Sequence, residues 1–164
     1  MGKFMEKKLR KRETQLADAG MGVILFAVWA VAKVNLFLAM SGFFLEDVYK
    51  IAEENGIGRK FFVLLLFVII AVLLIWQLST RLYIGICAVR EGKGKPQGKA
   101  YLVLAAVLLI TELQSVWGML VTRPEENIPD AIMSLCLEAA SVYILLELLT
   151  SGIFVKHMRK KRKA

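Results

Sequence analysis

Charged side chains inside long apolar stretches are the residues of this 164-residue chain that could do chemistry. There are five of them: Lys33, Arg81, Glu112, Glu138 and Glu147. Ionisable groups in such surroundings are costly, face protein or water rather than lipid, and commonly mark proton, ion or substrate pathways. Their presence therefore predicts either a polar path through a membrane or contacts that dock a partner within it.

Lys33 and Glu112 are expected to form an ion pair with each other. Each falls near the middle of its apolar stretch, and the two carry opposite charges. Asn35 and Gln114 follow them by two residues and are expected to add hydrogen bonds. A buried pair of this kind is weak evidence of stability, but it favours one register between helices.

The last apolar stretch carries two carboxylates, Glu138 and Glu147, nine residues apart. At about 100° per residue, a helix directs them to opposite sides. Because one bundle has one interior, we expect one carboxylate to face a second subunit or a partner membrane protein, or to be protonated in an apolar site. Two interpretations of Glu138 stay open: a proton or cation site, or a neutral acid hydrogen-bonded to Ser134 or Ser141.

Arg81 lies toward the basic end of its stretch, on one helix face with Gln77 and Thr80. Long basic side chains in this position can extend to the membrane surface. We therefore predict Arg81 to be an anchor on lipid phosphate, with Glu147 as the other candidate partner. Gln77 is predicted to belong to the intramembrane polar network.

The elements that must position these side chains are four spanning helices. The chain is 57% hydrophobic with mean hydropathy +0.58, above the roughly 45–50% of soluble domains. Four stretches reach the roughly 20 residues that span a bilayer: about 20–45, 61–88, 101–121 and 131–155. All three prolines lie between them. The sequence predicts one all-α integral membrane domain, an up-down bundle of two hairpins.

The orientation follows from the 22 lysines and arginines. Sixteen lie in the N-terminal segment 1–18, the loop 90–99 and the tail 156–164, and four in the other two loops. Basic loops face the cytoplasm, so we expect both termini there, in the cell membrane (plasma or inner). Beside membrane spans, the basic segments are expected to meet anionic lipid rather than nucleic acid.

Several kinds of site are not expected. Two cysteines and one histidine give no disulfide framework, metal site or histidine-based catalytic centre, and no cofactor is implied. The loop Gly92–Lys99 resembles a phosphate-binding loop only loosely, because no pair of its glycines has the required spacing and Ala100 stands where a hydroxyl residue would hold magnesium. We predict that the chain is not an enzyme.

Two functions remain from this pattern. The first is a small oligomeric channel or transporter for an ion or small solute, using the intramembrane polar residues. The second is a non-catalytic accessory or assembly subunit of a larger membrane complex. A membrane enzyme acting on lipid is a third class, but no nucleophile with a base, and no metal-ligand cluster, supports it.

Overall fold

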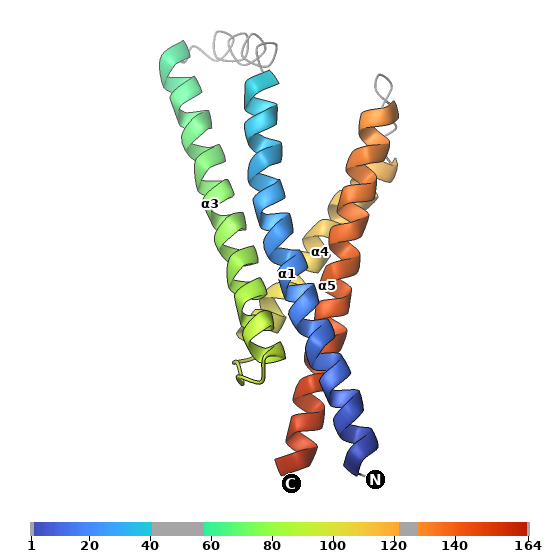
Figure 1. Ribbon diagram of the computed structural model, residues 1–164. Coiled ribbons are helices and arrows are strands. Elements are labelled where there is room, and N and C mark those ends of the chain that lie inside the picture. The colour runs from blue at the N-terminus through green and yellow to red at the C-terminus, as the bar shows by residue number, and fades with distance from the viewer. Residues whose placement is uncertain (1, 41–57, 122–127, 164) are drawn as a thin grey trace. The chain divides into compact units, whose positions relative to one another are not determined.

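The structure is a computed structural model that describes residues 2–40, 58–121 and 128–163, apart from the side chains of 2–4, 33, 36–40, 59, 128–133 and 162–163. All the regular secondary structure in these ranges is helical (Figure 1). The helices are α1 (Gly2–Met40), α3 (Arg59–Gly92), α4 (Ala100–Val121) and α5 (Ile128–Lys163).

Each of the four helices is long and apolar enough to cross a membrane, over Met5–Ala32, Lys60–Gly92, Ala100–Val121 and Ser134–Lys161. The prediction of an all-helical chain with four such segments is therefore confirmed for the described residues. Residues 41–45, the end of the first expected span, lie outside them. Helices α1 and α5 also continue through the basic segments at the two ends of the chain, because lysine, arginine and glutamate are good helix formers.

The chain divides into two compact units: Met1–Phe26 with Arg81–Ala164, and Ala27–Thr80. In the first unit α4 and α5 pack side by side. Its buried apolar core combines residues of α1, α3, α4 and α5: Leu16, Ala19, Val23, Ile84, Ala88, Tyr101, Ala105, Leu145, Leu148 and Val155.

Glycines allow α1 and α3 to approach closely within the first unit. A Cβ atom built on Gly85 would lie 2.7 Å from the carbonyl oxygen of Gly20 and 2.5 Å from a side-chain carbon of Ile24. Gly92 is equally close to α1, since its Cβ would lie 2.6 Å from the carbonyl oxygen of Glu13. Helices in membranes commonly pack through small residues, because the lipid tails are apolar and the hydrophobic effect does not drive helices together.

The connection from α3 to α4 is short and begins with a turn at Gly94. This residue has φ of 88°, a left-handed conformation that only glycine adopts without strain. The backbone N–H groups of Lys93, Gly94 and Lys95 donate to the last carbonyls of α3. The end of α3 and the start of α4 are thereby held close together.

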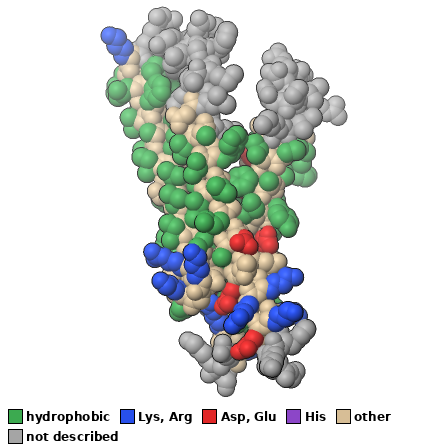
Figure 2. Space-filling model, in the orientation of Figure 1, with side chains coloured by type: hydrophobic (Ala, Val, Ile, Leu, Met, Phe, Trp, Pro, Cys, Tyr) green, Lys and Arg blue, Asp and Glu red, His purple; other side chains and the backbone are tan. Residues whose placement is uncertain are grey.

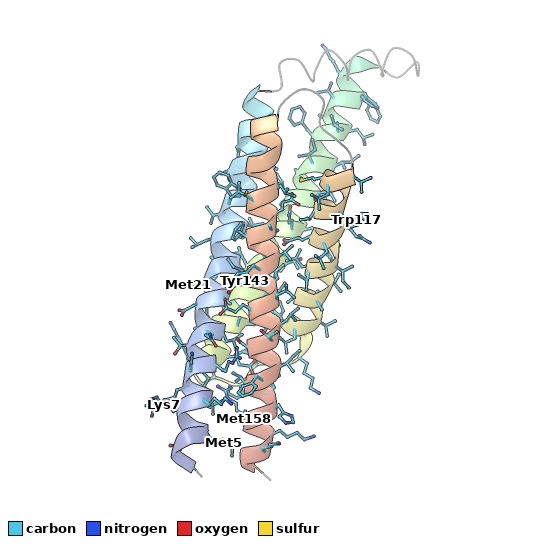
Figure 3. All side chains as sticks on the ribbon, turned by 90° about the vertical axis from the view of Figure 1, so that its right-hand side faces the viewer. Met5, Lys7, Met21, Trp117, Tyr143 and Met158 are labelled. Atoms are coloured by element: carbon cyan, nitrogen blue, oxygen red, sulfur yellow. The ribbon has the colours of Figure 1, made fainter. Side chains whose placement is uncertain are left out.

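The surface of the helices is largely apolar. On the face shown in Figure 2, hydrophobic side chains cover the helix bodies, and most charged side chains gather toward the end where both chain termini lie. Trp117 is 70% exposed and projects outward (Figure 3), as do many aliphatic side chains. In the second unit, the α3 segment exposes Phe61, Leu64, Val68, Val72 and Trp76. Exposed apolar surface of this extent suits lipid contact.

Candidate functional site

The first candidate site is a buried ion pair between Arg81 of α3 and Glu112 of α4. The Nη2 atom of Arg81 donates to Oε1 of Glu112, and the two side chains are only 8% and 11% exposed. Two such charges leave water only when they satisfy one another, because an unpaired buried charge is very costly. Within the first unit the pair therefore ties α3 to α4.

Helix α5 completes the cluster with Ser141 and Glu138. The Nη1 atom of Arg81 donates to Oγ of Ser141 at 3.2 Å, and Ser141 is 5% exposed. Glu138, one turn earlier on α5, lies close enough to Glu112 for the two carboxylates to interact electrostatically. The polar cluster, defined here as Arg81, Glu112, Glu138 and Ser141, thus joins three helices.

The cluster contains hydrogen-bonding capacity that its described members do not use. Atom Oε2 of Glu112 is buried without a hydrogen bond of good geometry from a described residue, although the hydroxyl of Ser141 lies near this carboxylate, and Nε of Arg81 likewise donates none. A buried carboxylate oxygen without a donor is costly. It is a suitable position for a proton or a cation.

Arg81, which was predicted to be an anchor on lipid phosphate, thus pairs with Glu112, whereas the predicted partner of Glu112, Lys33, has its side chain outside the described residues. The reason is the register of α3 against α4. Arg81 lies 11 residues before the end of α3 at Gly92, and Glu112 lies 12 residues after the start of α4 at Ala100. Two helices joined by a short loop bring such equidistant residues to one level. Counting outward from the loop would have found the pair, whereas centring the span on its most apolar part placed Arg81 near the surface.

The other predicted path residues have different surroundings. Gln77 and Gln114 are exposed, and Asn35 is exposed and donates to the carbonyl oxygen of Val31 on its own helix. The side chain of Lys33 lies outside the described residues. Glu147 is half-buried on α5, and its carboxylate has no hydrogen bond or ion pair among the residues that the structure describes. Of the seven residues predicted for the polar path, Glu112 and Glu138 are thus brought together.

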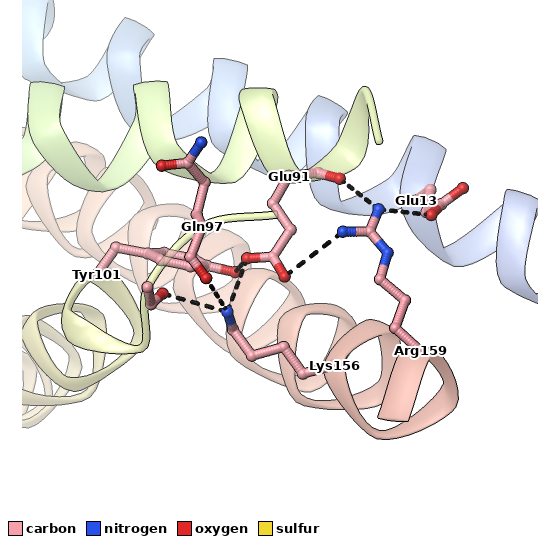
Figure 4. Close-up of polar contacts among 7 residues, drawn as sticks. Glu13, Glu91, Gln97, Tyr101, Lys156 and Arg159 are labelled. Carbon is pink, nitrogen blue, oxygen red and sulfur yellow. Dashed lines mark hydrogen bonds and ion pairs between the residues drawn. The ribbon is translucent and has the colours of Figure 1, made fainter. Parts of the chain in front are cut away.

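A second cluster, which sequence reasoning missed, surrounds Glu91 at the end of α3 (Figure 4). Glu91 is 1% exposed. Its carboxylate accepts a 2.7 Å hydrogen bond from the hydroxyl of Tyr101 and pairs with Nζ of Lys156 at 3.0 Å. Nη1 of Arg159 lies 3.8 Å from its other oxygen. One carboxylate therefore gathers side chains from α4 and α5.

The same cluster reaches α1 and the loop between α3 and α4. Nη2 of Arg159 pairs with Glu13 at 2.7 Å and donates to the backbone carbonyl of Glu91 at 2.9 Å. Nζ of Lys156 donates to the backbone carbonyls of Gln97 and Gly98. We call Glu13, Glu91, Tyr101, Lys156 and Arg159 the basic-end clasp. The sequence signal for it was an acid, Glu91, set within the basic loop region, but sequence alone does not show that this acid is buried.

A pocket of about 730 Å³ adjoins the clasp. It is lined by parts of α1, α3, the connecting loop and α5: Leu9, Glu13, Glu91, Gly94, Pro96, Gln97, Gly98, Lys99, Lys156, Arg159 and Lys160. The described residues contain no group of histidine, cysteine, aspartate and glutamate side chains arranged to hold a metal ion.

Comparison with family models, curated proteins and solved structures finds no match to this chain.

Proposed function

We propose that the chain is an integral membrane protein that acts as a small channel or transporter for an ion or small solute, with the polar cluster as part of its path. The observation that supports this proposal is the buried Arg81–Glu112 pair between helices long enough to span a bilayer. Intramembrane ionisable groups are costly and mark functional sites by default. Apolar packing would hold the same helices together at least as well as a buried ion pair.

The proposed topology has both termini and the loop 90–99 in the cytoplasm of a cell with the chain in its plasma or inner membrane. Its support is the concentration of basic residues in these three segments. In this arrangement the basic-end clasp lies at the cytoplasmic surface. The polar cluster lies deeper, since Arg81 is 11 residues from Gly92, or about 17 Å along the helix.

The chemistry follows from competition for Glu112. Arg81 neutralises this carboxylate while its Oε2 atom stays without a donor. A proton or cation arriving at Glu112 or Glu138 weakens the attraction between Arg81 and Glu112, which loosens the contact of α3 with α4. Binding of the transported species is thereby coupled to a change in helix packing, as alternating access requires.

The test is flux through purified protein in liposomes under an imposed proton or cation gradient. We expect the native chain to dissipate the gradient and Glu112→Gln and Glu138→Gln to lose most of the flux. Thr111→Val is the matched control, because Thr111 precedes Glu112, is exposed, and among the described residues its hydroxyl bonds only to the carbonyl of Leu108. Unchanged flux in both glutamine variants, or no flux in the native chain, would contradict the proposal.

The second candidate function is that of an accessory or assembly subunit, and Glu147 favours it. This residue is opposite Glu138 on α5, beside Tyr143, which is 65% exposed. A carboxylate on this side suits a neighbouring subunit or a partner membrane protein. The two functions are separated by mass measurement in detergent: a homo-oligomer with flux supports transport, whereas a stoichiometric complex with another membrane protein and no flux supports the accessory role.

A further inference from the structure

We propose that the pocket beside the basic-end clasp binds a phosphate-bearing anion. The pocket lies in the first unit, between Leu9 and Glu13 of α1, the loop residues 94–99, and the end of α5. Its volume of about 730 Å³ is within the roughly 300–1,000 Å³ of small-molecule sites. It is larger than a single phosphate group requires, so the phosphate can be part of a larger molecule.

The charge of the lining points to an anion. The lining carries four basic side chains (Lys99, Lys156, Arg159 and Lys160) and two acidic ones (Glu13 and Glu91). Both acids are engaged inside the clasp, Glu91 with Lys156 and Glu13 with Arg159. Lys99 and Lys160 are exposed and form no ion pair among the described residues. Two positive charges on the pocket are therefore left for a ligand.

The basic-end clasp fixes the backbone next to Lys99 and Lys160. Lys156 is fastened to the backbone of Gln97 and Gly98, which immediately precede Lys99. Arg159, fastened to Glu13 and to the Glu91 backbone, immediately precedes Lys160. The ammonium groups of Lys99 and Lys160 thus extend from neighbours that are held in place. A fixed backbone at both lysines lowers the ordering that phosphate binding requires, although the lysine stems themselves stay flexible.

The apolar part of the lining suits a phosphate joined to an apolar or neutral group. Leu9 and Pro96 contribute this surface, and α5 is mainly apolar up to Val155, just before the pocket residue Lys156. A phospholipid headgroup and a soluble phosphate ester share the recognising chemistry. Both present a negative phosphate to the two lysines and a less polar remainder to the rest of the pocket.

The test uses the full-length protein in neutral detergent and native mass spectrometry with three probes: phosphatidylglycerol, phosphatidylcholine and inorganic phosphate. The variant is the double substitution Lys99→Gln with Lys160→Gln. The matched control is Lys95→Gln with Lys161→Gln, which removes the same charge from the same loop and the same tail but does not touch the pocket. All four lysines are exposed, so neither double variant is expected to unfold.

We expect the pocket variant to bind phosphatidylglycerol or inorganic phosphate, whichever the native chain binds, at least about tenfold more weakly. Each basic residue near a phosphate surface contributes roughly a factor of five. The control variant is expected to bind as the native chain does. Saturable binding of phosphatidylglycerol alone assigns the site to a headgroup, and saturable binding of inorganic phosphate assigns it to a soluble ester. Equal losses in both double variants, or no anion binding by the native chain, would overturn the proposal without bearing on flux through the polar cluster.

Discussion

Arg81 and Glu112 are 31 residues apart in the sequence and form a buried ion pair between α3 and α4. Both charges belong to helices long and apolar enough to cross a membrane. Such a pair stabilises a fold weakly when intact, but it is expensive to break because the remaining charge is left in an apolar site. Because of this asymmetry, variants of the pair can be tested by their unfolding free energy as well as by flux.

Replacing Arg81 alone is expected to be strongly destabilising. Arg81→Met leaves Glu112 buried without its cation, and the expected loss is about 3–5 kcal/mol of unfolding free energy. The double variant Arg81→Met with Glu112→Leu removes both charges and is expected to recover most of the loss. Unfolding in detergent of the native chain, the single variants Arg81→Met and Glu112→Leu, and the double variant measures all four stabilities of the cycle. A double variant as unstable as the two single losses combined would contradict a direct pair.

The close approach of α1 and α3 gives a second prediction. Gly85→Ala places a methyl group 2.7 Å from the carbonyl oxygen of Gly20, so α1 and α3 must separate, and overpacking of this kind costs about 1–3 kcal/mol. Gly118→Ala is the matched control, because its Cβ would have no described atom within 4 Å and alanine favours helix over glycine. Thermal unfolding in detergent is expected to show a lower midpoint for Gly85→Ala and an unchanged or higher midpoint for Gly118→Ala.

Four helices could be predicted from the sequence because the length and hydropathy of a span are properties of contiguous residues. Which residues form the buried ion pair could not be predicted, because this depends on the register between helices. Lys33 and Arg81 were both available to Glu112, and depth estimated within each span favoured Lys33. The short connection that begins at Gly94 brings Arg81 and Glu112 to the same level, where they pair.

The proximity of Ser141 to Glu138, one of the alternatives that the sequence left open, illustrates the opposite case. Their spacing of three residues places both side chains on one face of a helix, and both lie in the polar cluster. Helical periodicity alone was sufficient for this inference. The clasp around Glu91 needs five side chains from four helices, and no local pattern in the sequence brings such distant residues together.

The hydroxyl of Tyr101 gives a third prediction. It is the donor of a 2.7 Å hydrogen bond to the buried carboxylate of Glu91, so Tyr101→Phe removes one of the groups that satisfy this charge. The expected cost is about 1–3 kcal/mol of unfolding free energy. Tyr143→Phe removes the same atom from a side chain that is 65% exposed, and it is expected to leave stability unchanged. Equal effects of the two substitutions would show that the hydrogen bond to Glu91 is not the cause.

The proposed orientation predicts the sidedness of chemical labelling. In a chain with Cys87 and Cys136 replaced by alanine, Lys95→Cys and Gly58→Cys each introduce one thiol at an exposed position. Gly58 precedes α3 and Lys95 follows it, so the two thiols lie on opposite sides of the membrane if α3 spans it. A membrane-impermeant maleimide applied to intact cells is expected to label Gly58→Cys and to reach Lys95→Cys only after the cells are opened. Labelling of Lys95→Cys in intact cells would reverse the orientation.

Glu147 gives the last prediction, on self-association. Its carboxylate is half-buried, opposite Glu138 on α5, with no side-chain partner in the described part of the chain. A carboxylate among apolar side chains is best satisfied by a hydrogen bond across a subunit interface, and such bonds between membrane helices contribute about 1 kcal/mol. Glu147→Leu is therefore expected to weaken self-association about fivefold per interface, measured by light scattering across a dilution series in detergent.

The conservative variant Glu147→Gln keeps both a donor and an acceptor, so it is expected to associate as the native chain does. Leucine and glutamine are similar in size, which separates loss of the polar group from loss of packing. If the leucine variant associates as strongly as the glutamine variant, Glu147 does not lie in a subunit interface. If the native chain is monomeric at every concentration, the oligomeric part of the proposed function is wrong, and Glu147 then favours docking to a different membrane protein.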